Sequence, residues 1–389
     1  MIYVGIDIAS SKHDFIMLNN SGKFSTKRSI TIPNTNEGYK KLHNSIQEFC
    51  GANHDFQVRI GLESTGFYHL NLLFFLLQLN YSITVINPKL INLYKKSRNV
   101  HNPKTDNLDS KMICNYLLDN KSSFKPYTLL SYHSEALKSL SRERFSLVED
   151  IRLAKINIYK LVSQIFPEFL KLFSNIYQGS AIQILERYPN PLKLSKARLS
   201  SIAALIHGRC NTQAYDLIQA AKSSIGNNSD HLSFQLLQGV KKLKSLESQI
   251  LEYDLQIQYY VDLVNPIILS IPGVGYTTAG LILGEIGDIS RFVNASHLIS
   301  YAGLDIEVYE SGKFKVKNRS ISKKGSKYLR YALFQVAKVI WRFDSSFEAY
   351  YQKKQSENKH FYVILGHIQT KLLRVIYSVL KNNLPYSPR

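Results

Sequence analysis

The first candidate catalytic residues in this chain are acids near the ends of two apolar runs and a pair of acids one helical turn apart. Asp7 comes near the end of the apolar run VGIDIAS, and Glu63 comes near the end of another, IGLEST. In KTDNLDSKM, residues 104–112, Asp106 and Asp109 stand three residues apart, which is one turn of a helix and places both on the same face. Carboxylates this close repel each other, so the pair needs a lysine or a metal ion between its members.

The four acids together favour a metal site. Ligands of open sheets gather beyond the carboxyl ends of the strands, where Asp7 and Glu63 are predicted to lie. Four carboxylates without matching bases favour Mg²⁺ or Mn²⁺, because hard divalent cations take oxygen ligands. Such ions can activate an attacking oxygen and stabilise the leaving oxygen at phosphorus. Taken alone, each acid is more simply a surface charge or a helix cap, as Asp106 after Thr105 would be.

A turn rich in glycine is a candidate DNA-binding element. Residues 272–275 read PGVG between two helical patterns, as in a helix-hairpin-helix element. Exposed amides of Gly273 and Gly275 would hold a DNA phosphate without reading the base sequence. An ordinary tight turn between helices explains the same residues equally well.

A basic segment over residues 311–330 is a candidate nucleic-acid surface. It contains no acid, and its cations are Lys313, Lys315, Lys317, Arg319, Lys323, Lys324, Lys327 and Arg330. Glycine and aromatic residues among the cations suit close approach to a phosphate backbone, so we expect binding rather than a solvated loop alone. Residue types alone do not select Ser311 as a nucleophile above Ser320 or Ser322, because serines in such loops commonly cap helices.

The composition agrees with a folded protein that binds a polyanion. The chain has 389 residues, 44% of them hydrophobic, and a net charge of +20 from 49 Lys and Arg against 29 Asp and Glu. Nucleic acid is the commonest partner for such an excess. An anionic membrane would also attract it, but the apolar run LNLLFFLLQLN is too short to span a bilayer, so no membrane partner is expected.

The amino terminus and the cysteines point to an internal location. The start MIYVGIDIAS has no basic region ahead of an apolar stretch and no cleavage site, so we expect a cytoplasmic protein. Cys50, Cys114 and Cys210 are far apart and lack CxxC spacing, so we expect buried free thiols rather than disulfides or a zinc site.

The elements that must position the acids form an α/β region. IYVGIDIAS, HDFIMLNN and a stretch around KFSTKRSI predict three strands, and a helix follows over residues 36–49. FQVRIGLES and YSITVINP predict two further strands, with helices at YHLNLLFFLLQLN and DNLDSKMICNYLLDN. Three strands before any helix favour a mixed sheet opened by an antiparallel meander.

Two long apolar stripes follow at helical spacing. The first contains Leu137, Leu140, Leu147, Ile151, Ala154, Ile158, Leu161 and Ile165, and the second contains Leu236, Leu243, Leu246, Ile250, Tyr253, Ile257 and Tyr260. Arg144 fills the one polar seam position of the first stripe. These heptad patterns predict long helices that pair either as a hairpin within the chain or as a dimer seam. A mostly helical region with one irregular basic loop completes the chain.

Seven stretches, in this order, closely resemble the DEDD transposases of the insertion sequence one hundred and ten family: VGIDIAS, GLESTGFY, VINPK, KTDNLDSKM, SIPGVGYTTAGLIL, YAGLDIEVYESGK and SISKKGSKYLRYALF. The resemblance covers both ends of the chain, with little of it over residues 167–230. No motif position departs from the family's pattern, so nothing indicates an inactivated copy.

The resemblance implies three domains. These are a RuvC-like domain of the ribonuclease H fold over residues 1–125, a helical coiled-coil connector with an insertion over 126–265, and a mostly helical transposase domain over 266–389. It also implies a structured noncoding guide RNA, donor and target DNA as partners, and a dimer or tetramer whose active sites combine two subunits. Such a protein would act at the nucleoid of a bacterial or archaeal cell.

The resemblance also assigns site residues. The family's acidic tetrad falls on Asp7, Glu63, Asp106 and Asp109 as ligands of Mg²⁺ or Mn²⁺. Its nucleophilic serine falls on Ser311, which would attack DNA and form a covalent phosphoserine. The covalent link would keep the energy of the broken phosphodiester, so strand exchange would need no external energy source.

Other functions remain open at this point. A metal-dependent junction-resolving nuclease would use the same acids with water as the nucleophile, and a DNA invertase of the same family would use the same machinery. GIDIASSK is also similar to the first phosphate loop of actin-like sugar kinases, but that loop is usually richer in glycine and no second loop is evident. A nucleic-acid-binding protein without activity would not need the intact acids.

Overall fold

A computed structural model describes residues 1–64, 68–98, 106–121, 126–177, 179–207, 212–306, 310–311, 314–315 and 321–388, with only the backbone at residues 106–108, 129, 310, 311, 314 and 315. The chain divides into two compact units, Met1–Tyr132 and His133–Arg389. The predicted connector and C-terminal regions therefore fall together in the second unit, apart from the first residues of the connector.

The first unit is built on a mixed five-stranded sheet, as predicted. Its strands lie in the order β3-β2-β1-β4-β5. Their bounds are β1 Ile2–Ile8, β2 Lys12–Leu18, β3 Ile30–Pro33, β4 Val58–Glu63 and β5 Ser82–Ile86. The strands β1, β2 and β3 form an antiparallel meander, and β4 and β5 run parallel to β1. The third strand begins at Ile30, later than the predicted stretch around residues 23–30, because the residues before it form turns and bends.

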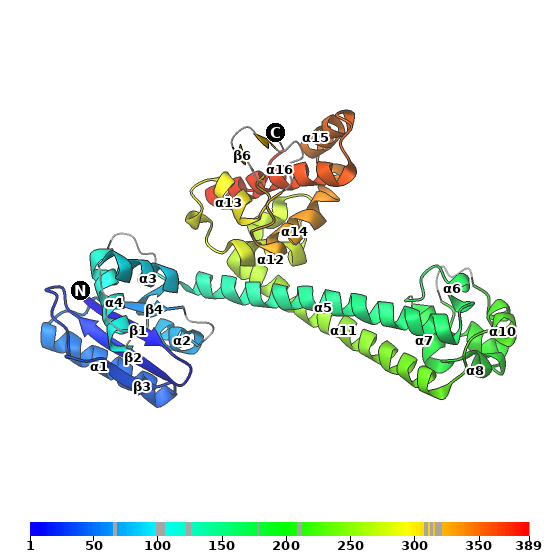
Figure 1. Ribbon diagram of the computed structural model, residues 1–389, viewed down its shortest axis with the longest axis horizontal. Helices are drawn as coiled ribbons and strands as arrows, with labels where there is room; N and C mark the ends of the chain where they lie inside the picture. The colour runs from blue at the N-terminus through cyan, green and yellow to red at the C-terminus, as the bar shows by residue number, and fades with distance from the viewer. Residues whose placement is uncertain are drawn as a thin grey trace. The chain divides into compact units, whose positions relative to one another are not determined.

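Helices cover both faces of this sheet (Figure 1). On one face lie α1 Asn36–Asn53 and α2 Leu70–Gln78, and on the other lie α3 Pro88–Ser97 and α4 Asp106–Asp119. The sequence patterns did not predict α3. Asn87 caps this helix and Pro88 occupies its first turn, which is a common start for a helix.

A pair of neighbouring glycines lets α4 lie directly on the sheet. Gly5 of β1 and Gly61 of β4 are opposite each other in the parallel register. A Cβ atom added to Gly5 would lie 2.2 Å from the carbonyl oxygen of Ser110, in the first turns of α4. A Cβ atom at Gly61 would lie 2.7 Å from the side chain of Ile113. Only glycine at these two positions allows this close approach of helix to sheet.

Gly5→Ala should therefore loosen the packing of α4 while the rest of the chain stays folded. The added methyl group meets backbone atoms that cannot rotate away, so we expect a loss of roughly 1–3 kcal/mol in the first unit. Hydrogen exchange of peptides from β1 and α4 would measure it. Gly51→Ala in α1 is the matched control, because nothing lies within 4 Å of the added atom. Trp341 reports the second unit alone, and its unfolding transition should not move.

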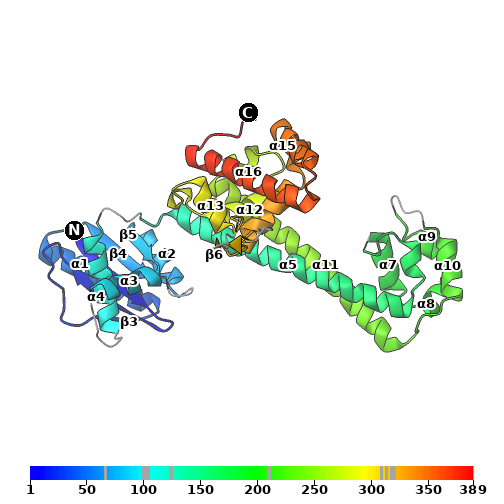
Figure 2. The same cartoon turned by 45° about the horizontal axis from the view of Figure 1, so that its top comes forward.

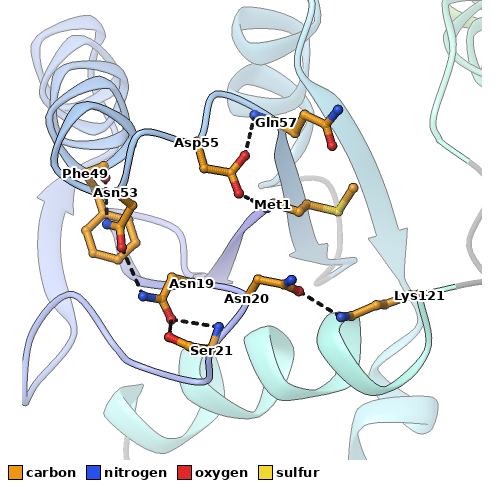
Figure 3. A network of polar contacts seen from close by, with 9 residues as sticks. All are labelled: Met1, Asn19, Asn20, Ser21, Phe49, Asn53, Asp55, Gln57 and Lys121. Atoms are coloured by element: carbon orange, nitrogen blue, oxygen red, sulfur yellow. Dashed lines mark hydrogen bonds and ion pairs between the residues drawn. The ribbon is translucent and has the colours of Figure 1, made fainter.

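Polar contacts tie the turn after β2 to helices on both faces of the sheet (Figure 3). The side chain of Asn19 donates to that of Asn53, at the end of α1, over 3.0 Å. Lys121, just beyond α4, donates to Asn20 over 2.8 Å. These contacts fix the C-terminal end of α4 and so help to set where its first turn lies.

The second unit contains a pair of long helices, α5 Leu129–Ile165, of which the residues from His133 onward belong to this unit, and α11 Asp230–Val264. They pack antiparallel within one chain, so the hairpin rather than the dimer seam accounts for the two apolar stripes (Figures 1 and 2). Arg144, the polar seam residue, donates two hydrogen bonds to the carboxylate of Asp254 on α11, at 2.5 and 3.2 Å. Lys155 faces Glu247 at 3.9 Å.

Short helices between the two long ones form a separate core with their ends. They are α6 Phe169–Leu172, α7 Gly179–Arg187, α8 Pro191–Ser195, α9 Leu199–Ala203 and α10 Ala214–Lys222. Apolar side chains from these helices pack with Ile158 and Leu161 of α5 and with Leu236 of α11. This cluster accounts for the residues over which the family resemblance was weakest.

The described remainder of the second unit is helical, with one small hairpin among the described residues. Its elements are η1 Pro266–Ser270, α12 Tyr276–Ile286, η2 Ile289–Arg291, α13 Ala295–Tyr301, β6 Glu310–Ser311, β7 Phe314–Lys315, α14 Lys327–Ala337, η3 Ile340–Arg342, α15 Ser345–Ser356 and α16 Phe361–Asn382. Within the described ranges, α16 is the one helix long and apolar enough to cross a membrane. Half of that stretch is buried in the unit, as in the core helix of a globular domain.

Candidate active site

Strand register places two of the predicted acids on one face of the sheet. Because side chains two residues apart share a face, Asp7 lies on the same face as Gly5, and Glu63 on the same face as Gly61. This is the face that α4 covers. Both acids stand at the carboxyl ends of neighbouring parallel strands, and both are half-buried.

The start of α4 lies toward the same end of the sheet. Ser110, one turn into α4, packs over Gly5, whereas Lys121 beyond its C-terminal end lies over the ring of Tyr3 near the start of β1. The helix therefore runs opposite to β1, and its first turn, which contains Asp106 and Asp109, lies nearest the ends of the strands. The side chain of Asp106 falls outside the described part of the structure.

A lysine, Lys95 of α3, neutralises Asp109. Its ammonium group donates to the Asp109 carboxylate at 2.6 Å, and both side chains are about four-fifths buried. Lys111, two residues after Asp109 on α4, has a different partner: its ammonium group donates to the backbone carbonyl of Lys27 at 2.7 Å. The cation expected beside the paired acids of α4 is thus supplied, in this structure, by a different helix.

A fifth acid, Asp14, was not selected from the sequence. It lies directly opposite Asp7 in the antiparallel register of β1 and β2, and it is almost fully buried. Thr31 donates to it at 2.5 Å, and Lys12 lies 3.5 Å from its other oxygen. Like charges directly opposite each other in a sheet are destabilising unless something cationic compensates. An aspartate inside the apolar stretch HDFIML was the available signal, but its strand partner could not be known from one sequence.

The donor set suits Mg²⁺ or Mn²⁺. Carboxylate oxygens are the ligands these ions prefer, and the facing pair of Asp7 and Asp14 concentrates negative charge where a cation would offset it. Among the side chains that the structure describes, which exclude Asp106, no three acids, histidines or cysteines stand close enough together to hold an ion.

Ser311 lies in the small hairpin of the second unit. It is the second residue of β6 and pairs with Phe314 of β7, while Glu310 pairs with Lys315. Nearby, Ile306 and Ile321 form an antiparallel bridge that closes the two ends of this segment. Ser311 thus lies at the end of β6 that leads toward β7.

The other candidate serines differ in their surroundings. Ser322 is engaged as a brace, because its hydroxyl donates to the side chain of Asp305 at 2.5 Å and its amide donates to the Asp305 carbonyl at 2.8 Å. Ser320 lies outside the described residues. The structure therefore gives Ser322 a role in holding the base of the loop.

The predicted basic segment is only partly described. Lys313, Lys317 and Arg319 lie outside the described residues, and of Lys315 only the backbone is described. Lys323, Lys324 and Lys327 are exposed. Lys323 has a left-handed backbone with φ of 53°. These exposed cations are placed where phosphate groups can reach them.

Arg330 differs from the other cations of the segment. It is partly buried and donates to the carbonyl of Ala302 at 2.8 Å. Burial lowers the pKa of its guanidinium from the ordinary value. This contact joins α14 to the end of α13, so Arg330 has a structural task in addition to any contact with nucleic acid.

The glycine-rich turn lies between η1 and α12. Gly273 has a φ of 81°, which a residue with a side chain rarely adopts, and Gly275 is the N-cap of α12. Both glycines are exposed, whereas Ile271 and Val274 between and before them are buried. The turn therefore presents backbone to solvent at the start of a helix, although a 3-10 helix rather than an α-helix precedes it.

A buried carboxylate fixes the end of the basic segment. Glu285 of α12 is 2% exposed and receives hydrogen bonds from Arg142 of α5 at 2.6 and 3.1 Å. Ser326, the N-cap of α14, donates to the same carboxylate at 2.8 Å. The hydrogen bonds to Glu285 raise the pKa of the Arg142 guanidinium. Three helices meet at this network, which holds the start of α14 in place.

Comparison with known proteins identifies the family. A family model described as transposase matches residues 4–167, and a second, described as transposase of the IS116/IS110/IS902 family, matches residues 265–352. Together they cover more than half of the chain and leave out residues 168–264. The first match contains all four predicted acids, and the second contains Ser311.

Individual relatives span much or all of the chain. A pilin gene-inverting protein of Moraxella bovis is 25% identical over 392 aligned positions, which cover 100% of this chain and 98% of that protein. A mini-circle putative transposase for IS117 from Streptomyces coelicolor is 25% identical and covers 78% of this chain and 75% of its own length. Thermus thermophilus RuvC with a Holliday junction substrate overlaps 32% of this chain and 99% of its own, at 12% identity and a TM-score of 0.24, which is too slight a likeness to support an inference.

Proposed function

We propose, for a chain that belongs to the IS116/IS110/IS902 family of transposases, that DNA strands are cut and rejoined by a serine nucleophile together with an acidic metal site. A transposase of this family is a DNA phosphoryl-transfer enzyme, so the reaction class and the DNA substrate follow from the family. The nucleophile, the metal ligands, the guide RNA and the oligomer are the parts that we propose. With the family established, the actin-like kinase alternative is set aside.

One observation supports the acidic site most directly. The register of β1 and β4 puts Asp7 and Glu63 on the same face at neighbouring strand ends, and α4 brings its first turn toward that end. We assign Asp7, Glu63, Asp106 and Asp109 as the metal ligands of a ribonuclease H-like domain. A bound Mg²⁺ or Mn²⁺ would supply Lewis-acid stabilisation of the charge that develops on the phosphate oxygens.

The serine step balances without a co-reactant. The Ser311 hydroxyl oxygen forms a bond to phosphorus as the bond from phosphorus to one sugar oxygen breaks. The serine loses its proton, and the released sugar oxygen gains one to become a hydroxyl. A free serine is a weak nucleophile at its ordinary pKa, so it has to be activated within the site. The reverse step, with a different sugar hydroxyl attacking, rejoins the strands.

The positive charge supports a nucleic-acid complex. A net charge of +20 suits an extended polyanionic partner. We assign the further partner as a structured noncoding RNA that pairs with donor and target DNA, within a dimer or tetramer. Action at the nucleoid, in the cytoplasm of a bacterial or archaeal cell, follows from this assignment.

The test is a search for a metal-dependent covalent protein–DNA link. The full chain, with RNA transcribed from DNA flanking its reading frame, would be mixed with labelled donor and target DNA and run on a denaturing gel. We expect a protein–DNA band with Mg²⁺ or Mn²⁺ and at least about 100-fold less of it after chelation, because the acids then lack their cation. Cleaved DNA without a linked protein would instead support the junction-resolving nuclease that uses water.

A second candidate outcome, inversion, is favoured by the pilin gene-inverting relative, which aligns with the whole of this chain. The cutting and rejoining steps would be the same, and only the arrangement of the two DNA sites would differ. A plasmid with two sites in inverted orientation separates the outcomes, because inversion exchanges the segment between them, whereas transposition inserts one DNA into another. Reactions without the RNA would show whether either outcome needs it.

A further inference from the structure

A groove of about 1230 Å³ lies in the second unit among α13, α14 and α16, with Phe145 of α5 at one side. Figure 1 shows α13 and α14 on either side of α16, and both pack against it. The volume exceeds the roughly 300–1,000 Å³ of ordinary small-molecule pockets. The groove shares Lys323, Lys327 and Arg330 with the basic segment described above, but none of the functional assignments above uses its aromatic wall.

Aromatic rings form much of its wall. Tyr331 and Phe334 come from α14, Tyr350 from α15, and Tyr362 from α16. The rings of Phe334 and Tyr362 are within 16° of parallel, with centroids 6.4 Å apart, and Tyr362 is 64% exposed. The ring of His360 is also stacked with that of Tyr362, with centroids 5.6 Å apart and 29° from parallel, and the exposed part of the Tyr362 ring adds a surface on which a nucleobase can stack.

Cations surround the rings. Lys323, Lys327 and Arg374 are exposed along the groove. Among the described lining residues Asp305 is the one acid, and Ser322 already engages it. Burial, together with the charge of Lys354, lowers the pKa of His367. A neutral imidazole offers one donor and one acceptor, as the edge of a base requires.

The groove continues toward the proposed nucleophile. Ile306 and Ile321 both line it, and the two residues pair with each other at the base of the segment that carries Ser311. A strand seated in the groove therefore reaches the foot of the serine hairpin. Cations beside stacked rings suit a chain that alternates phosphates and bases, whereas a protein partner would need acids opposite these cations.

We propose that this groove binds unpaired nucleotides of the DNA strand that is cut, with a base stacked on Tyr362 and the phosphates beside the lysines and Arg374. The proposal rests on the proposed function for the identity of the strand. Holding bases out of the duplex would present a separated strand at the serine hairpin. Such a groove would select DNA whose strands are separated, whatever the identity of the bases.

Gly366 of α16 provides a way to fill the groove without damaging the fold. It lines the groove, and a Cβ atom added there meets nothing within 4 Å. Gly366→Leu should preserve or increase the stability of α16, since glycine in a helix interior costs up to about 1 kcal/mol. Gly51→Leu in α1 is the matched control, because that helical glycine is also unobstructed.

The experiment measures how tightly the full chain binds a single-stranded DNA oligonucleotide that contains 2-aminopurine. The fluorescence of the 2-aminopurine reports both binding and stacking. We expect Gly366→Leu to weaken binding at least about tenfold and to remove the quenching caused by stacking, while duplex affinity changes less than about twofold. Tyr362→Ala should weaken single-strand binding about 5–100-fold, and Tyr362→Phe should restore it. Tyr215→Ala, at another exposed tyrosine, should have no effect.

Three results would overturn the proposal. The first is unchanged single-strand affinity and quenching in both groove variants. The second is a selective loss of binding to RNA of the same sequence, which would assign the groove to RNA. The third is altered self-association in sedimentation with DNA binding intact, which would assign it to a second copy of the chain. None of these assays needs catalysis, so failure of the serine mechanism would appear separately, as a missing covalent link.

Discussion

Ser311→Ala is expected to abolish the covalent protein–DNA link and all strand rejoining. Alanine keeps the small size of the side chain but removes the oxygen that would bond to phosphorus, so the loss should be at least about 10³-fold. The readout is the protein–DNA band on a denaturing gel, together with the rejoined products. Because β6 and β7 are only two residues long each, the substitution should leave the melting of the second unit unchanged.

Neighbouring serines supply the control for this result. Ser322→Ala removes the hydrogen bond to Asp305 and should slow the reaction only several-fold, because it loosens the base of the loop without removing the nucleophile. Ser320→Ala should form the link as the unchanged protein does. A link that persists in Ser311→Ala and vanishes in either of the other variants would move the nucleophile to that serine.

Loss of the acids is expected to have an effect of similar size. Asp109→Asn or Glu63→Gln should reduce strand cutting by roughly 10³-fold, because a neutral amide binds a divalent cation poorly and supplies no negative charge. Binding of DNA should stay the same or tighten slightly, since each change removes a negative charge near the phosphates. Cutting and filter binding, measured on the same preparations, separate the two effects.

Asp119→Asn is the matched control for Asp109→Asn. Both residues lie on α4 and both pair with a cation, Lys95 for Asp109 and Arg98 for Asp119, but Asp119 is at the other end of the helix. Asp119→Asn should cost about 0–1 kcal/mol of stability, as is usual for partly exposed ion pairs. Asp109→Asn should cost about 1–3 kcal/mol, because its pair with Lys95 is mostly buried. If Asp119→Asn lost activity to the same extent, or if Asp109→Asn lost DNA binding, the acids of α4 would be structural.

The sheet and its strand-end acids could be predicted because their signals are local. Apolar runs ended by Asp7 and Glu63 define both the strands and the acids, and the meander follows from three strands before a helix. Asn87 and Pro88 are a recognisable helix start, but the predicted strand YSITVINP included both residues, so α3 was not predicted.

Contacts that depend on register or on distant packing could not be predicted. Asp14 lies opposite Asp7 only because the two strands pair in one particular register, and a shift of one residue would turn it to the other face. Lys95 reaches Asp109 from another helix, and Glu285 is neutralised by Arg142 from a helix more than a hundred residues earlier. The polar seam residue Arg144 was apparent from the heptad pattern, but its partner Asp254 was not.

The antiparallel pairing of α5 and α11 limits which deletions or insertions the two long helices can accept. At about 1.5 Å per residue, the 37 residues of α5 span about 55 Å. Cross-links such as Arg144 to Asp254 hold the two helices at one offset. A deletion in one helix alone would move its cross-linking residues away from their partners and, unless it removed a multiple of seven residues, would also rotate its apolar stripe away from the other helix. Removal of seven residues from each helix would keep both stripes facing. The helical pair can therefore be shortened or lengthened only by whole heptads, and only by the same number in both helices.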